Sequence, residues 1–230
     1  MGTALITGAS RGIGREVART LASEGWRVLS GVRDPKSAPP GTQAETLDVA
    51  DAASIEALAE RLRARNERID ALVNNAGVYS GAARRLIWDV NVLGPLRLSR
   101  ALEPLLAPNA RVVMVTSGLG RLSDQPRSLV ERLSNPDLSL ADLERLATEA
   151  PGGYGASKAA LTAMARLFAK ELRPRGVLVN AISPGWVRTH MGGPSAPRSV
   201  KQGAASVLWG VRLPPDGPTG GVFEDGKATE

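Results

Sequence analysis

Apolar and polar positions along the chain form two alternating kinds of segment. Short apolar runs predict buried strands over 3–7, 27–32, 71–77, 111–117 and 177–183, with shorter strands at 44–47 and 220–223 and a loose end beyond. Apolar residues at helical spacing predict helices over 16–25, 54–65, 86–106 and 154–172. This alternation predicts a single α/β domain over residues 1–230, with a doubly wound parallel sheet flanked by helices. Ligands bind such sheets beyond the carboxyl ends of the strands.

A glycine-rich turn joins the first strand to the first helix. The sequence TGASRGIG runs from Thr7 to Gly14, in the strand-turn-helix context that a phosphate-binding loop requires. Gly8 allows a tight turn, Gly12 allows the backbone to approach a pyrophosphate, and Gly14 allows close helix packing. The free N–H groups of the helix N-terminus would face the anion. The turn therefore predicts a dinucleotide site, the alternative being an ordinary strand-to-helix connection.

Tyr154 and Lys158 lie four positions apart in the last long helical pattern. Because four residues make about one helical turn, both side chains project from the same face. An adjacent cation favours the phenolate, so we expect Lys158 to lower the pKa of Tyr154. Tyr154 is therefore a candidate general acid or base. The alternative is a core tyrosine with a solvated lysine one turn later.

Composition narrows the chemistry. The 230 residues contain no cysteine and a single histidine, His190, which excludes thiol chemistry and leaves no histidine cluster for a metal. The net charge of +6 is spread along helices and mixed with acids, so no nucleic-acid partner is expected. No apolar run reaches the roughly 18–20 residues of a membrane span, and the early first strand leaves no room for a signal peptide. We expect a cytoplasmic protein.

Taken together, the motifs resemble the short-chain dehydrogenase/reductase family, in that family's order, from the first strand to about Thr189. The motifs are the glycine turn, NNAG at 74–77, Asn91, Ser117, Tyr154, Lys158 and PG at 184–185. The resemblance implies a Rossmann-type domain and a catalytic set of Asn91, Ser117, Tyr154 and Lys158. In this set Ser117 would orient a carbonyl, Tyr154 would transfer the proton and Lys158 would hold the nicotinamide ribose. Asn91 would bend its helix and bind a relay water, or else make a merely structural hydrogen bond.

The residues at the end of the second predicted strand indicate which nicotinamide cofactor is preferred. NAD-preferring relatives have a carboxylate there, whereas this chain has Val32, followed by Arg33. Arg33 and Arg11 could clamp a 2′-phosphate, which predicts NADPH/NADP+, unless both arginines are merely exposed. Asp34 is expected to point past the ribose, and Asn74 and Asn180 to be structural. The resemblance implies cofactor contacts from Gly8, Ser10, Arg11, Gly12, Ile13, Gly14, Arg33, Asp48, Val49, Asn75, Ala76, Gly77, Tyr154, Lys158, Pro184, Gly185, Val187 and Thr189.

Residues 120–150 form an insertion between Ser117 and Tyr154 that resembles the monomeric carbonyl reductases of the family. Helix signals there include a capping pattern at Ser139 and Asp142. We expect a helical flap over the central helices and hence a monomer, with a substrate lid, and a dimer or tetramer, as alternatives. A short link before Asn91 and a brief Gly/Pro-rich segment at 189–203 leave the substrate open.

The leading hypothesis is an NADPH-dependent reductase of small aldehydes, ketones or quinones, in which a tyrosine is the general acid. The alternatives are an NADP-dependent secondary-alcohol dehydrogenase and a non-catalytic NADP-sensing protein of the same fold.

Overall fold

A computed structural model describes residues 2–79 and 81–229. Within this part of the chain, eight strands form one sheet in the order β3-β2-β1-β4-β5-β6-β7-β8. The first seven run parallel, and β8 is antiparallel to β7. The strands are β1 (Thr3–Thr7), β2 (Arg27–Val32), β3 (Gln43–Thr46), β4 (Ile69–Asn74), β5 (Leu106–Val115), β6 (Leu178–Ser183), β7 (Val222–Glu224) and β8 (Lys227–Ala228).

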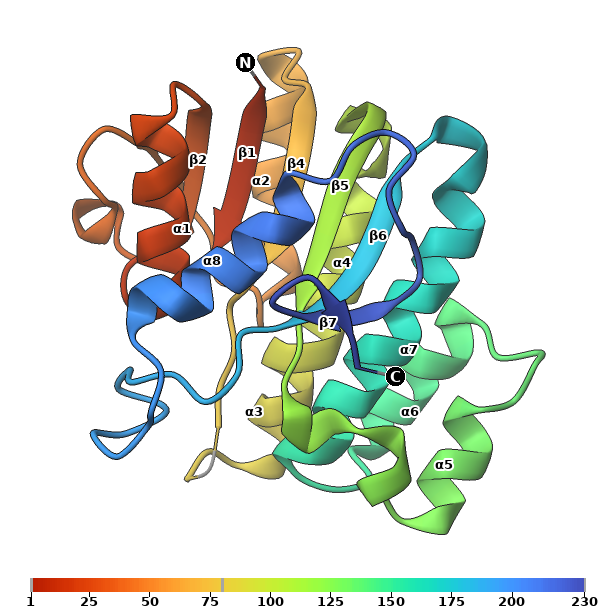
Figure 1. Cartoon of the computed structure of the whole chain (residues 1–230). Helices are drawn as coiled ribbons and strands as arrows, with labels where there is room; N and C mark the ends of the chain where they lie inside the picture. Colours follow the sequence, from red (N-terminus) through yellow and green to blue (C-terminus); the bar gives the residue numbers. More distant parts are fainter. Residues whose placement is uncertain (1, 80, 230) are drawn as a thin grey trace.

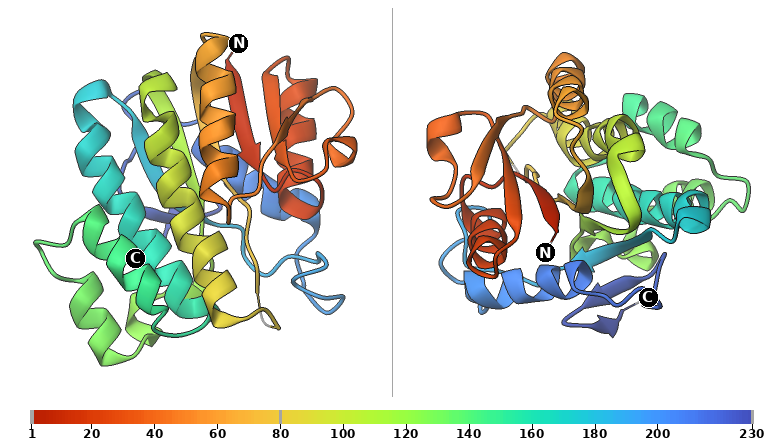
Figure 2. Two further views of the ribbon diagram at one scale, coloured as in Figure 1. Left: turned by 180° about the vertical axis from the view of Figure 1, so that it is seen from behind. Right: turned by 90° about the horizontal axis from the view of Figure 1, so that it is seen from above.

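Helices cover both faces of the sheet. On one face, α1 (Gly12–Ser23) packs beside α8 (Val200–Val211) (Figure 1). On the other face lie α2 (Ala52–Ala64), α4 (Gly94–Leu102) and α7 (Tyr154–Leu172) (Figure 2). Because successive side chains of a strand alternate between faces, Leu5 and Ile6 of β1 belong to different apolar clusters, one on each side. The predicted doubly wound α/β domain is confirmed.

The predicted elements at 3–7, 27–32 and 154–172 coincide with β1, β2 and α7. The single helix predicted over 86–106 is instead divided into α3 (Arg84–Trp88), a π-helical turn (Asp89–Leu93) and α4. A 3₁₀ turn (Glu103–Leu105) containing Pro104 follows α4, since proline cannot continue the backbone hydrogen-bond ladder. As a result β5 begins at Leu106, earlier than the pattern indicated.

Two elements near the end of the chain were not predicted from the sequence. No helix was predicted in the Gly/Pro-rich segment at 189–203, but α8 begins within it, at a capping box formed by Ser199 and Gln202. The final residues were expected to be loose, but Lys227 and Ala228 form β8 and pair with β7. Pairing with a neighbouring strand orders a segment that has no apolar periodicity of its own.

The segment between Ser117 and Tyr154 contains α5 (Arg127–Leu133) and α6 (Leu140–Glu149), at the lower right of Figure 1. The predicted pair Ser139 and Asp142 forms a capping box at the start of α6. Leu143 and Leu146 of α6 are buried, and both helices contact α7. Helix α6 also contacts α3 and the π-helical turn, so the segment lies over the helical elements that carry Asn91 and Tyr154. Across the described residues, no helix is both long and apolar enough to cross a membrane.

Candidate functional site

The carboxyl ends of the parallel strands surround a cleft with a cavity volume of about 860 Å³. Its walls come from the loops after β1, β2, β3, β4 and β6 and from the first turn of α7. The predicted site residues that line it are Gly8, Ser10, Arg11, Gly12, Ile13, Arg33, Asp48, Val49, Asn75, Ala76, Gly77, Tyr154, Lys158, Pro184 and Thr189. Five predicted residues support the cleft without lining it: Gly14, Asn91, Ser117, Gly185 and Val187.

The glycine turn has the backbone geometry expected of it. Gly8 and Gly12 have φ of +67° and +56°, in the left-handed region that favours glycine. A Cβ atom on Gly14 would lie 2.4 Å from the Asn75 side chain, so this glycine permits the close packing of α1 against the turn after β4. Helix α1 begins at Gly12 with no side-chain cap, which leaves its first N–H groups free to face the cleft.

Thr7 joins the glycine turn to the NNAG turn. Its hydroxyl accepts hydrogen bonds from the backbone N–H groups of Asn75 and Ala76, at 3.0 and 2.9 Å. Asn75 returns a bond from its side-chain amide to the Thr7 carbonyl, at 2.9 Å. Asn74 points the other way and donates to Ser99 of α4, so it braces the sheet as predicted.

Charged side chains gather at the end of the cleft near β2 and β3. Arg11 and Arg33 are exposed on its wall, and neither has an ion-pair partner within the described part of the chain. The Asp34 carboxylate accepts a hydrogen bond from the Lys36 backbone N–H at 3.0 Å and lies outside the cleft lining. Asp48 lines the cleft and accepts from the Ala50 backbone N–H at 2.9 Å. This end of the cleft therefore presents two cations, while the Asp34 carboxylate caps the 3₁₀ turn that follows β2.

Lys158 is buried at the opposite end, with its side chain beside the last residue of β5. Its ammonium donates to the Val115 carbonyl at 2.8 Å and lies 5.6 Å from the centre of the Tyr154 ring. Only 4% of the residue is exposed, and this burial lowers the pKa of Lys158 to about 8. The amine therefore loses its charge near the upper end of the physiological pH range.

The expected lowering of the Tyr154 pKa is wrong for this structure. Burial raises the pKa of Tyr154, the hydrogen bond with Ser117 partly opposes this, and Tyr79 adds to the rise. Desolvation of the phenolate dominates because the ring lies against protein and the Lys158 charge is itself destabilised by burial. The phenol is therefore held in its protonated form.

Ser117 lies two residues after the end of β5, its hydroxyl accepts from the Leu119 backbone N–H at 3.3 Å, and it favours the charged form of Tyr154. Thr116, the residue between β5 and Ser117, is buried and directed toward α7, where its hydroxyl contacts Thr162 at 3.0 Å. Strand alternation thus separates the two hydroxyls as expected. Ser117 is the one within reach of Tyr154.

Asn91 lies in the π-helical turn and is completely buried. Its amide oxygen accepts from the Val78 backbone N–H at 2.9 Å, and its nitrogen donates to the Val78 carbonyl at 3.0 Å. The nitrogen also donates to Ser157, whose hydroxyl bonds the Tyr154 carbonyl at 2.7 Å. A π-helical turn interrupts the helix at Asn91, whose side chain joins this turn to the residue after NNAG and to α7.

The turn after β6 combines lining and supporting residues. Pro184 and Thr189 face the cleft, and the Thr189 hydroxyl accepts from the Gly192 backbone N–H at 3.1 Å. Val187 is buried and forms an isolated parallel bridge with Arg198. Asn180 bonds Pro218 and Gly221 near β7, which makes it structural as predicted.

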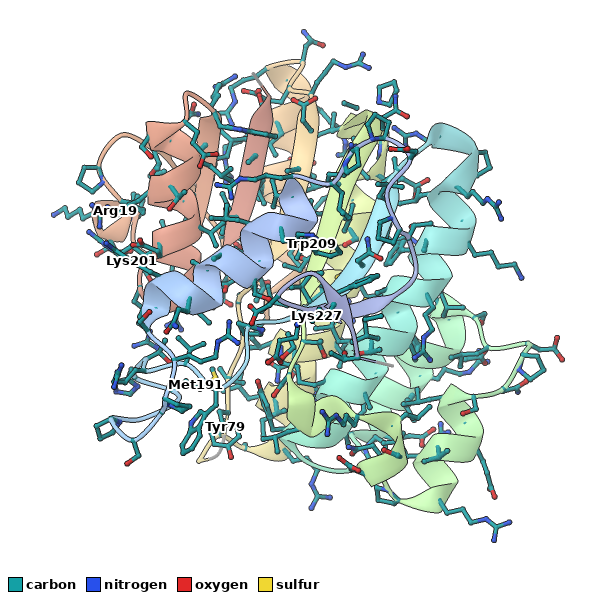
Figure 3. All side chains as sticks on the ribbon, in the orientation of Figure 1. Arg19, Tyr79, Met191, Lys201, Trp209 and Lys227 are labelled. Atoms are coloured by element: carbon teal, nitrogen blue, oxygen red, sulfur yellow. The ribbon has the colours of Figure 1, made fainter. Side chains whose placement is uncertain are left out.

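Several residues that line or support the cleft were not identified as site residues from the sequence. Tyr79 packs edge-on against Tyr154, with ring centres 4.7 Å apart, and lies with Met191 at the mouth of the cleft (Figure 3). Trp88 is fully buried and donates to the Gly152 carbonyl at 2.9 Å, which anchors the loop before Tyr154. Ser157 joins Asn91 to α7. Only Ser157, three positions from Tyr154 on the same helix, could have been found from spacing.

Comparison with known proteins agrees with this geometry. The model of the short chain dehydrogenase family matches residues 2–128, and the enoyl-(acyl carrier protein) reductase model matches residues 139–208. Carbonyl reductase (NADPH) 1 of Sus scrofa is 30% identical over 269 aligned positions, which cover 99% of this chain and 93% of that protein. The (+)-neomenthol dehydrogenase of Arabidopsis thaliana is 31% identical, with 99% and 97% covered.

Solved structures have the same fold. Salutaridine reductase from Papaver somniferum has a TM-score of 0.85 at 24% identity, covering 98% of this chain and 100% of its own. The NADPH-bound carbonyl reductase from chicken fatty liver has a TM-score of 0.75 at 26% identity, with 100% and 98% covered. The family model that matches more than half of the chain and the relatives covered nearly end to end show that the chain belongs to the short-chain dehydrogenase/reductase family.

Proposed function

We propose that this protein reduces the carbonyl group of a small or medium aldehyde, ketone or quinone, with NADPH as the hydride donor and Tyr154 as the general acid. The observation that carries the proposal is the pair formed by Tyr154 and the buried Lys158 at one end of a cleft whose other end is built by a glycine turn and two arginines. Carbonyl reductases that are named for NADPH are among the relatives, which supports the same activity. A cytoplasmic location is part of the proposal.

The cleft residues fit NADPH. A Cβ atom on Gly12 would meet only Thr189, at 3.4 Å, so the backbone of the glycine turn is open to a diphosphate lying over it. The uncapped start of α1 offers N–H donors to the same group. Arg11 and Arg33 would hold the 2′-phosphate, because the carboxylate of Asp34, the residue after Arg33, is engaged with the Lys36 backbone.

Bound NADPH supplies a hydride to the carbonyl carbon, and the protein must supply the proton. Tyr154 is protonated at neutral pH because burial raises its pKa, so its O–H can donate to the oxygen as negative charge develops there. Ser117, which acts on the pKa of the phenol, would donate to the same oxygen and polarise the carbonyl. A protonated phenol favours reduction over the reverse reaction.

Lys158 would hold the nicotinamide ribose and return a proton toward Tyr154. Its pKa of about 8 leaves the ammonium charged at neutral pH yet able to release a proton. Asn91 fixes the positions of the elements around this proton relay, since it bonds both Val78 and Ser157. A Cβ atom on Gly77 would lie 3.4 Å from the Asn91 amide oxygen and 3.7 Å from the Lys158 nitrogen, so Gly77 leaves the space between these groups open.

The test is a panel of aliphatic and aromatic aldehydes, ketones and quinones, each incubated with the protein and either NADPH or NADH. We expect loss of NADPH absorbance with at least one class and a slower reaction with NADH. Faster consumption of NADH would contradict the cofactor assignment. No carbonyl-dependent consumption of either nucleotide, while secondary alcohols reduce NADP+, would contradict the direction proposed.

A further inference from the structure

Arg198 lies outside every sequence motif, yet its backbone holds the turn after β6. Its N–H donates to the Trp186 carbonyl at 3.2 Å, and its carbonyl accepts from the Arg188 N–H at 2.8 Å. These two bonds flank Val187 and form the isolated bridge. Both backbone polar groups of Arg198 thus bond the stretch of backbone that the nicotinamide would meet.

The Arg198 side chain extends from that bridge to the hairpin between β7 and β8. Its two terminal nitrogens bond the two carboxylate oxygens of Asp225, at 2.8 and 2.6 Å. Asp225 occupies the hairpin turn with φ of +51°. This bidentate pair raises the pKa of Arg198 and lowers that of Asp225, so both groups are charged at neutral pH. Bidentate pairing fixes orientation as well as distance.

Gly185 shows how closely the side chain lies against the turn. Its φ is +71°, and a Cβ atom there would lie 2.6 Å from Cδ and 3.0 Å from Nε of Arg198. The Arg198 stem therefore packs directly on the Gly185 backbone. Among the described residues, the buried Nε has no hydrogen-bond partner. The terminal nitrogens are placed mainly by Asp225, with a longer hydrogen bond to the Gln202 carbonyl at 3.3 Å and a longer ion pair with Glu224 at 3.5 Å.

A second set of bonds joins the start of the same turn to the same hairpin. The Ser183 hydroxyl donates to Glu224 at 2.6 Å and accepts from the Gly185 N–H at 3.2 Å. Ser206 of α8 donates to the Ser183 carbonyl at 2.8 Å and accepts from the Asp225 N–H at 2.9 Å. The hairpin is thus connected to the turn before Pro184 through serines, and beyond it through Arg198.

We propose that Arg198, clamped by Asp225, is a positioning residue for the nicotinamide half of the cofactor cleft. This rests on the proposed function, in which the turn from Pro184 to Thr189 meets the nicotinamide. Val200, two positions after Arg198, lines the cleft, so a shift of this segment changes the cleft wall directly. The adenosine half is built by the loops after β1, β2 and β3 and does not depend on the clamp.

The test compares a whole cofactor with its adenosine half. Arg198→Met retains the apolar stem without the charge, and Asp225→Asn retains the shape of the partner. Affinities for NADPH and for 2′,5′-ADP are measured by titration, together with kcat and KM for the best carbonyl substrate. We expect weaker NADPH binding and a kcat about 10- to 100-fold lower, the loss expected of a misplaced reacting group. Binding of 2′,5′-ADP should be unchanged in both variants.

Arg212→Met is the matched control. Arg212 pairs with Glu24 at the far end of α8, so the variant removes the same charge from an ion pair outside the cleft. It should leave both affinities and kcat unchanged. If Arg198→Met and Asp225→Asn weaken NADPH and 2′,5′-ADP equally, or lower only the unfolding temperature, Arg198 is a general structural support and the proposal is wrong.

The titrations with NADPH and 2′,5′-ADP do not require catalytic turnover. A chain that binds both nucleotides but reduces no carbonyl contradicts the proposed function, while the ratio of the two affinities still tests the clamp. Reversal of the pair, with Arg198→Asp and Asp225→Arg together, should restore part of the NADPH affinity lost in Arg198→Asp alone. No restoration would show that the two residues do not act through each other.

Discussion

Lys158→Met removes a cation from the interior of the protein, and its effect on stability should change sign with pH. Burial lowers the Lys158 pKa from 10.5 to about 8. At 1.36 kcal/mol per pKa unit, holding the charged lysine in the fold costs about 3 kcal/mol at neutral pH. Methionine has a similar length and no charge, so the variant avoids this cost.

The substitution also has a destabilising component. It removes the hydrogen bond to the Val115 carbonyl, which a charged donor makes worth about 2 kcal/mol. The variant should therefore be more stable than the parent by about 1 kcal/mol at pH 7. Because the folded parent binds fewer protons than the unfolded chain between about pH 8 and 10.5, its stability rises with pH across this interval. The variant does not gain this stability, so it should be the less stable protein at pH 10.

Urea unfolding of the nucleotide-free parent and variant, at intervals from pH 7 to pH 10, measures the difference directly. Other titrating groups are common to both proteins and cancel in the difference. Catalytic turnover should be lost in the variant even where its fold is the more stable. A variant that is less stable by the same amount at every pH would refute the account of Lys158 as a strained buried cation.

The remaining predictions concern the cofactor and assembly. Arg33→Asp should weaken NADPH binding by about 10- to 100-fold, as expected for loss of a charge-assisted contact, and shift preference toward NADH. Lys36→Asp, with the same charge change outside the cleft lining, should leave the NADPH/NADH ratio unchanged; an equal shift in both variants would point to net charge rather than a specific clamp. We also propose that α5 and α6 cover a surface that would otherwise pair between subunits, so light scattering should give a monomer near 24.1 kDa and association once residues 122–150 are replaced by a short Gly/Ser linker. An intact protein that is a tetramer built on the central helices would contradict this role and favour a lid.

Sequence patterns predicted the parts of the fold whose signals are local. The apolar runs of β1 and β2 and the long helix from Tyr154 coincide with the structure because burial of one continuous face is visible in the residue order. Helix α8 was missed because it is apolar on nearly all sides, with Gly203 and Gly210 within it, and so shows little periodicity. Strand β8 was missed because it forms only by pairing with β7, and this pairing leaves no pattern in the local sequence.

The site was predictable to the extent that motifs encode it. The motifs identified Tyr154 and Lys158, but the sign of the Tyr154 pKa shift was wrong because burial is a property of the packed site. Tyr79 and Arg198 were missed for a related reason. Their partners, Tyr154 and Asp225, are distant in sequence and come near only when β4, β6 and β7 lie in one sheet.

The central claim, that Tyr154 donates the proton, is tested most directly by Tyr154→Phe. The ring and its packing against Tyr79 remain, so NADPH titration should give an unchanged affinity. Turnover of the best carbonyl substrate should fall by about 100-fold or more, the contribution of a general acid. A Tyr154→Phe protein that binds NADPH and keeps most of its turnover would contradict the account.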